Sequence, residues 1–98
     1  MTRKDIFNEI NRERTRQETE LWGPEVDDKN TVNDWIAYIT AYAGEGYAHP
    51  SDGVKFRQAM VKVAALAIAA IEAGERNSGY PPCSNDPLTS EGFGKEGF

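Results

Sequence analysis

The chain has 98 residues, a formal net charge of −5 and a charged fraction of 28%, values that suit one small soluble domain. No stretch approaches the roughly 20 apolar residues of a membrane span, and no basic-then-apolar leader opens the sequence. The acidic balance argues against DNA as a partner, although Arg12, Arg14 and Arg16 cluster enough to meet a small anion. We therefore expect a cytoplasmic protein that binds neither DNA nor membranes.

The first predicted helix spans residues 3–22. Thr2 and Asp5 have the spacing of a capping box, in which each side chain accepts a hydrogen bond from the other residue's backbone N–H. Gly23 and Pro24 end the helix, because glycine favours a helix C-terminus and proline lacks the backbone N–H that continuation requires. The connector that follows has the composition of a turn.

Two further helices are predicted. Thr31 and Asp34 repeat the capping-box spacing at the start of a helix over 32–44. After a stretch punctuated by glycine and proline, an alanine-rich helix is expected over 53–75. No segment shows the alternation typical of a strand. The predicted fold is therefore all-α: a three-helix antiparallel bundle with a long third helix.

The composition changes to glycine, proline, serine and asparagine near the C-terminus. This change divides the chain into a helical domain over 1–78 and an irregular tail over 79–98. Such a tail cannot bury enough apolar surface to fold alone. Phe93, Phe98 and Tyr80 keep a second interpretation open, in which the tail attaches to this chain or to a neighbouring one.

The third predicted helix is apolar on nearly every side. One stripe is formed by Phe56, Met60, Val63, Ala67 and Ile71, and a second by Val54, Val61, Ala65 and Ile68. Two shorter helices can hardly cover such a helix, and a core this small is marginal by itself. We therefore expect a homo-oligomer built around the third helix.

Two polar residues, Arg14 and Gln17, interrupt the inward apolar stripe of the first helix. One interpretation is that they form buried hydrogen bonds with carboxylates such as Asp34 or Glu45, because polar groups in a core need partners. The other interpretation is that they line a pocket, where a planar guanidinium suits the phosphate or base of a ligand.

The second helix carries two acids on the stripe that includes Tyr38. Asp34 and Glu45 are eleven residues apart in the sequence, which is about 16 Å along a helix axis. These two carboxylates therefore cannot hold the same metal ion.

Three segments carry a recognisable pattern. They read Glu13-Arg14-x-Arg16-Gln17, then Trp22-Gly23-Pro24-Glu25-x-Asp27-Asp28-x-Asn30-Thr31, then an alanine-rich helix that ends in Ala70-Ile71-Glu72. In these segments the chain resembles a group of small phage- and prophage-encoded proteins. That group looks related to the all-α, MazG-like nucleotide pyrophosphohydrolases.

The resemblance also implies what this chain lacks. In active MazG-like enzymes, a Glu-Glu-x-x-Glu stretch on one helix and a Glu-x-x-Asp pair on the next hold Mg²⁺, which requires hard oxygen ligands. In this frame the first stretch falls on Ala41, Tyr42 and Glu45, and the second on Ala59 and Lys62. Only one carboxylate is left, so the resemblance implies no metal, no cofactor and no catalytic residue.

The first functional hypothesis is a non-catalytic phage-type oligomer, a pseudoenzyme that acts in the host cytoplasm. It would bind a nucleotide, a nucleotide-derived signal or a host protein, for example to counter a host defence. Aromatic side chains would stack on a base while Arg14 and Lys62 meet phosphate. The expected ligand-binding residues are Arg14, Gln17, Trp35, Tyr38, Tyr42, Glu45 and Lys62.

Two alternatives remain open. The first is a surviving Mg²⁺-dependent nucleoside triphosphate pyrophosphohydrolase with rearranged carboxylates. Its acids would be Glu25, Asp27, Asp28 and Glu45. The second alternative is a protein-interaction module without a small ligand, whose tail engages a partner through Phe93 and Phe98.

Overall fold

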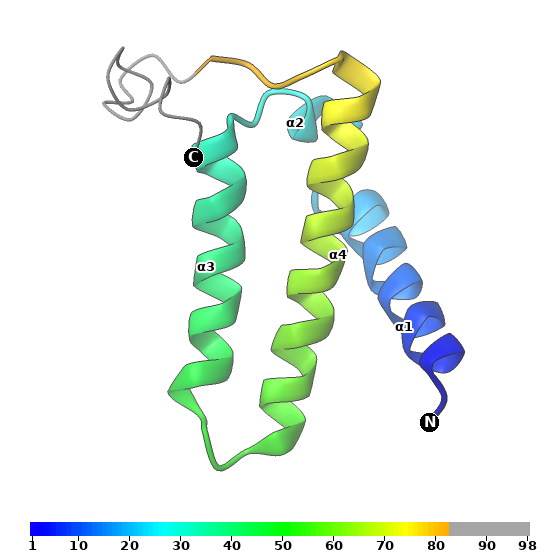
Figure 1. The fold of residues 1–98 in the computed structure, drawn as a ribbon, viewed down its shortest axis with the longest axis vertical. Helices are drawn as coiled ribbons and strands as arrows, with labels where there is room; N and C mark the ends of the chain where they lie inside the picture. The colour runs from blue at the N-terminus through cyan, green and yellow to red at the C-terminus, as the bar shows by residue number, and fades with distance from the viewer. Residues whose placement is uncertain (83–98) are drawn as a thin grey trace, which may run out of the picture.

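The computed structural model describes residues 1–82, so the predicted roles of Phe93 and Phe98 lie outside the described residues. Every regular element in the described part is helical, which confirms the all-α prediction (Figure 1). None of these helices is long and apolar enough to cross a membrane. The elements in chain order are α1 (Arg3–Arg16), the π-helical turn η1 (Gln17–Leu21), α2 (Pro24–Asp27), α3 (Val32–Ala48) and α4 (Gly53–Asn77).

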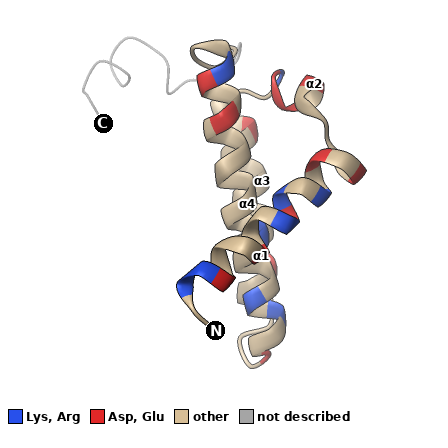
Figure 2. Ribbon diagram, turned by 90° about the vertical axis from the view of Figure 1, so that its right-hand side faces the viewer, with Lys and Arg blue, Asp and Glu red and all other residues tan. Residues whose placement is uncertain are grey.

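Helix α4 lies at the centre of the arrangement. It forms an antiparallel hairpin with α3, while α1 crosses it obliquely on the other side and slants away toward the N-terminus (Figures 1 and 2). The short α2 packs near the C-terminal end of α4. This central position agrees with the apolar character of α4, because such a helix must be covered from more than one direction.

The helix starts follow the sequence closely. In the capping box of α1, Asp5 donates its backbone N–H to the Thr2 hydroxyl at 3.2 Å. The same box opens α3, where the Asp34 N–H lies 3.2 Å from the Thr31 hydroxyl. Asp52 caps α4 by accepting hydrogen bonds from two backbone N–H groups of its first turn. Side chains therefore satisfy the free donors at the start of each long helix.

The helix ends differ more from the prediction. The second helix continues past Gly44 to Ala48, and α4 continues to Asn77. Gly46 is buried, and a Cβ atom placed there would lie 3.2 Å from the Ala59 Cβ. This glycine therefore permits α3 and α4 to approach closely, and it does not end the helix.

The first helix and its connector also depart from the prediction. The last turn of the predicted helix is a π-turn, η1, in which the Trp22 N–H donates to the Gln17 carbonyl at 2.6 Å. Pro24 stops this helix as predicted, but it also begins the helical turn α2, because proline suits the first position of a helix. The predicted turn between the first two long helices is therefore partly helical.

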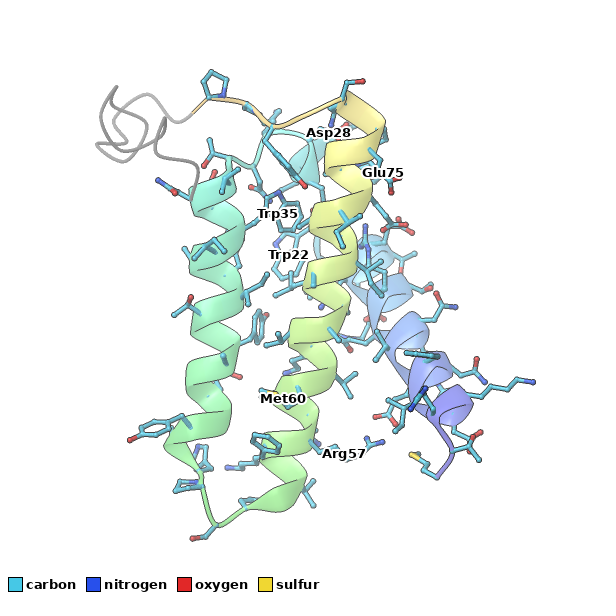
Figure 3. The ribbon with its side chains drawn as sticks, viewed as in Figure 1. Trp22, Asp28, Trp35, Arg57, Met60 and Glu75 are labelled. Atoms are coloured by element: carbon cyan, nitrogen blue, oxygen red, sulfur yellow. The ribbon has the colours of Figure 1, made fainter. Side chains whose placement is uncertain are left out.

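The buried core is small and lies where α2, α3 and the C-terminal half of α4 meet. Trp22 and Trp35 lie between α3 and this half of α4 (Figure 3). The opposite face of the hairpin is an open apolar groove of about 250 Å³. The buried apolar residues are Trp35, Ala59, Ala65, Leu66, Ala69 and Ala73. The groove is lined by Val32, Trp35, Ile36, Ile39, Ala67, Ala70, Ile71 and Tyr80.

Two glycines of α3 provide a matched test of this packing. A Cβ atom at Gly44 would meet nothing within 4 Å, whereas one at Gly46 would press on Ala59. We expect Gly44→Ala to raise the free energy of unfolding by about 0.5–1 kcal/mol, because alanine favours a helix. The free energy of unfolding of Gly46→Ala should lie about 1 kcal/mol below that of Gly44→Ala, because the added methyl group overpacks the contact with Ala59. Urea denaturation followed by circular dichroism measures both, and equal gains would contradict the close approach of α3 and α4.

Candidate functional site

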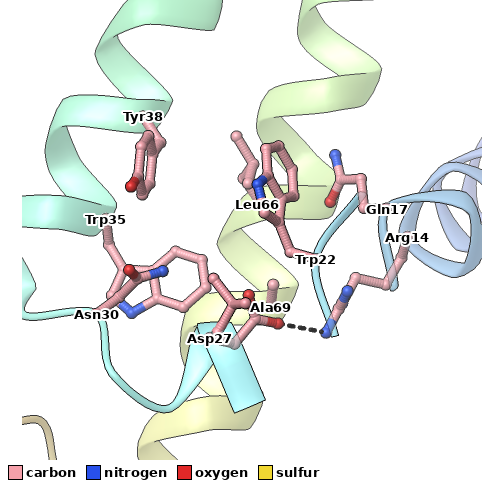
Figure 4. A pocket seen from close by; sticks show the side chains of 10 residues that line it. Arg14, Gln17, Trp22, Asp27, Asn30, Trp35, Tyr38, Leu66 and Ala69 are labelled. Carbon is pink, nitrogen blue, oxygen red and sulfur yellow. Dashed lines mark hydrogen bonds and ion pairs between the residues drawn. The ribbon is translucent and has the colours of Figure 1, made fainter. Parts of the chain in front are cut away.

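Arg14 is a buried cation that joins three helices. Its side chain projects from the last turn of α1, and the residue is 5% exposed. Its Nε donates to Glu72 on α4 at 2.9 Å, and a terminal nitrogen donates to Asp27 on α2 at 3.2 Å (Figure 4). Glu18 lies 3.5 Å from the same nitrogen. Arg14 therefore forms the buried hydrogen bonds of the first interpretation, but Asp27 and Glu72 replace the carboxylates that the sequence suggested.

The two aspartates of the connector act in different environments. Asp27 is 3% exposed, and burial raises the pKa of its carboxyl although the charges of Arg14 and Arg76 oppose that change. Asp28 is more accessible and accepts hydrogen bonds from Arg76 and from Asn77, the latter at 2.9 Å. These bonds lower the pKa of Asp28. Together the aspartates fasten α2 to α1 and to the end of α4.

A small closed cavity lies beside this ion-pair network. Its volume is about 10 Å³, enough for about one water molecule. Gln17 is 1% exposed and, among the described residues, its Oε1 has no hydrogen-bond partner; the same holds for the indole nitrogen of Trp35. The rings of Trp22 and Tyr38, which also line the cavity, stack on each other with their centroids 6.4 Å apart (Figure 4). The cavity is lined by Arg14, Gln17, Trp22, Val26, Asp27, Asn30, Trp35, Tyr38, Leu66 and Ala69.

A larger and more open space lies where α1 crosses α4. This space, which we call the cationic groove, has a volume of about 550 Å³. The Lys62 ammonium lies 5.5 Å from the centroid of the Tyr42 ring on α3, within the range of a cation–π contact. Figure 2 shows basic residues on α1 at this crossing and on α4 nearby. The groove is lined by Glu9, Arg12, Glu13, Arg16, Gln58, Val61 and Lys62.

The acids of the cationic groove are already engaged. Glu13 accepts two hydrogen bonds from Arg16, at 2.9 and 2.8 Å, and these bonds lower the pKa of Glu13. Glu9 is paired with Arg57. Within residues 1–82, Arg12 and Lys62 form no ion pair. The charges of Arg12 and Lys62 still help to lower the pKa of Glu9 and of Glu13 respectively. The groove therefore presents two cations that form no close ion pair, beside two carboxylates, to an incoming anion.

The structure divides the seven predicted ligand-binding residues between two places. The closed cavity is lined by Arg14, Gln17, Trp35 and Tyr38. Tyr42 and Lys62 meet at the cationic groove, and Glu45 lies with Lys62 in an adjoining hollow. Gln58, which lines the groove, was not predicted as a site residue, because its position on α4 gives no chemical signal by itself. Arg12 and Arg16, noted as part of a basic cluster, do line the groove.

The acids of the pyrophosphohydrolase alternative lie apart. Asp27 and Asp28 contact arginines near the start of α3, whereas Glu45 lies near its other end. The thirteen steps along α3 from Val32 to Glu45 correspond to about 20 Å. In the described part of the chain, no three His, Cys, Asp or Glu residues are grouped so that they could hold a metal ion.

No protein-family model matches the chain, and no curated protein or solved structure matches it either. The resemblance to MazG-like proteins therefore stays a prediction. What the two sites can do follows from their own geometry and charge. The closed cavity is too small for a nucleotide, while the volume of the cationic groove falls within the range of about 300–1,000 Å³ that is usual for ligand pockets.

The buried ion pair gives a stability prediction. Arg14→Met leaves the Asp27 carboxylate buried without its cation, which should lower the free energy of unfolding at pH 7 by about 3–5 kcal/mol. The double variant Arg14→Met/Asp27→Leu should recover most of that loss. Arg12→Met, which removes a cation that forms no ion pair in the described region, should change stability by less than about 0.5 kcal/mol. Urea denaturation measures all three variants.

The pH dependence of Arg14→Met has a definite sign. The pKa of Asp27 in the folded protein already lies above its ordinary value, and loss of the cation raises it further. The folded variant then binds more protons than the unfolded chain, so its stability deficit should shrink as the pH falls through the folded pKa. Two results would contradict the burial of the Arg14–Asp27 ion pair. One is a loss of less than about 1 kcal/mol in the free energy of unfolding of Arg14→Met at pH 7. The other is a loss that grows as the pH falls.

Proposed function

We propose that this chain is a non-catalytic, phage-type helical protein that binds a nucleotide or nucleotide-derived signal in the cationic groove. The observation that carries the proposal is the Lys62 ammonium, which is held over the Tyr42 ring on one wall of a 550 Å³ groove. Arg12 on the opposite helix supplies a second cation for phosphate. Such a protein would sequester its ligand without turning it over.

The aromatic contact that we propose for the base is Tyr38, which lines the cavity beside Arg14 and lies on the same helix as Tyr42. Tyr38 lies one helical turn before Tyr42 on α3, about 6 Å along the axis. It is 44% exposed and already stacks with Trp22. A base placed against Tyr38 would extend this stack while its phosphate reaches Lys62. Stacking of this kind tolerates different bases.

Binding is favoured over pyrophosphate hydrolysis by the state of the carboxylates. Glu13, Asp27 and Asp28 each accept hydrogen bonds from an arginine. Mg²⁺ would have to displace these guanidinium groups before it could use the same oxygens. Glu45 is the single acid that remains from the enzyme pattern, and the Lys62 ammonium lines the same hollow. Engagement of a partner protein by the tail stays a prediction.

Ligand binding can be tested by calorimetric titration. We expect AMP, ATP and other members of a nucleotide panel to give measurable heat, and Lys62→Met to weaken binding at least about tenfold by removing a charge-assisted contact. Lys29→Met removes a lysine that lines neither groove and should leave affinity within twofold. Absence of heat for every member of the panel would overturn the nucleotide proposal.

The same samples distinguish binding from turnover. With added Mg²⁺ or Mn²⁺, the non-catalytic proposal predicts no pyrophosphate release from nucleoside triphosphates above a protein-free control. Release that disappears in Glu45→Ala would support the pyrophosphohydrolase alternative instead.

We further propose that the chain is a homo-oligomer whose copies meet at the apolar groove between α3 and α4. Ile36 and Ile71 are 58% and 59% exposed on this face. A second copy would withdraw this apolar surface from water and so supply burial that the small core lacks.

Oligomerisation predicts a mass greater than one chain in size-exclusion chromatography with light scattering. Ile36→Glu should give a monomer, because it places a charge in the apolar interface. Phe7→Glu is a matched control, since Phe7 is equally exposed but lies on α1. A wild-type monomer at tens of micromolar concentration, or dissociation by both variants, would contradict an interface at the α3–α4 groove.

A further inference from the structure

A second hollow adjoins the cationic groove at Gln58 and Lys62. This second lobe has a volume of about 370 Å³ and shares Gln58 and Lys62 with the first. Its other lining residues are Glu45, His49, Lys55 and Ala59. Each lobe lies in the lower part of the usual size range for ligand pockets, and the two together approach its upper end.

The helix sets the backbone positions of the lysines in the two lobes. Lys55 and Lys62 are seven residues apart on α4, so they lie on the same face of the helix and about 10 Å apart along its axis. Gln58 lies between them on this face and lines both lobes. Arg12 adds a cation from α1 to the first lobe. Within the described residues, Lys55 forms no ion pair.

This spacing discriminates between classes of anion. The phosphates of a nucleoside triphosphate are contiguous, so one lobe would hold all of them and Lys55 would have no role. Two phosphates that belong to separate nucleosides match the two separated cations, with a neutral region between them at Gln58. A glutamine side chain offers both a donor and an acceptor there, which suits a sugar hydroxyl or a base edge.

The acid of the second lobe fits the same arrangement. Glu45 lines this lobe but not the first. A carboxylate repels phosphate, but it accepts hydrogen bonds from ribose hydroxyls or from exocyclic amino groups. Lys55 therefore provides the phosphate contact of this lobe, and Glu45 a contact to the nucleoside.

We propose that the two-lobed groove binds a dinucleotide-class ligand, with one phosphate between Arg12 and Lys62 and the other at Lys55. This inference rests on the proposed function, because it assigns the ligand class of the same groove. A dinucleotide would need the second lobe for binding, whereas a mononucleotide would need only the first.

Titration of the full chain with AMP, ATP, cyclic di-AMP and the linear dinucleotide pApA tests the inference at one fixed salt concentration, since charge contacts are screened by salt. We expect cyclic di-AMP or pApA to bind at least tenfold more tightly than AMP and ATP. Lys55→Gln should weaken dinucleotide binding about tenfold and leave AMP binding within twofold. Lys62→Met should weaken both, and Lys29→Gln neither; circular dichroism checks that each variant is folded.

The possible failures are distinguishable. If AMP or ATP binds as tightly as both dinucleotides, or if Lys55→Gln leaves dinucleotide affinity unchanged, the dinucleotide inference is overturned while the proposed function stands. If neither these four compounds nor any other member of the nucleotide panel binds, the proposed function itself is overturned.

Discussion

A guanidinium group withdrawn from water requires anionic partners, and Arg14 takes them from two other helices. Its contact with Asp27 fixes the short α2, and Asp28 extends the attachment to the end of α4. The C-terminal part of α1 is therefore held against α4 at Glu72, and nearer its N-terminus Glu9 pairs with Arg57 of α4. The cationic groove lies between these two attachments, where α1 crosses α4 (Figure 1).

The sequence predicted those features of the fold that depend on local chemistry. Capping by Thr2 and Thr31 and the stop at Pro24 depend on neighbouring residues, and the structure confirms them. The continuation of α3 through Gly44 and Gly46 was missed; the close packing of Gly46 against Ala59 of α4 is a tertiary contact that no local pattern reveals. The π-turn and α2 were also missed; α2 is held by the contact of Asp27 with Arg14, which lies thirteen residues earlier in the sequence.

In the candidate site, too, the features that follow from spacing along one helix were predicted, and those that depend on contacts between helices were not. Positions on one helix were related correctly, since spacing along a helix is fixed. Tyr42 and Lys62, two of the predicted ligand-binding residues, contact each other across α3 and α4. The partners of Arg14 were not predictable, because Asp27 reaches it only through the fold of the connector. Arg14 and Gln17 therefore line a closed cavity, and the groove with room for a ligand uses Arg12 instead.

The central claim is that a ligand occupies the cationic groove and not the closed cavity beside Arg14. The most direct measurement is a titration of ¹⁵N-labelled protein with cyclic di-AMP, observed in two-dimensional ¹H–¹⁵N NMR spectra. We predict that the signals of Arg12, Gln58 and Lys62 shift on binding, while the indole N–H signal of Trp35 stays unchanged. A shift of the Trp35 indole signal without changes along the groove would contradict this account.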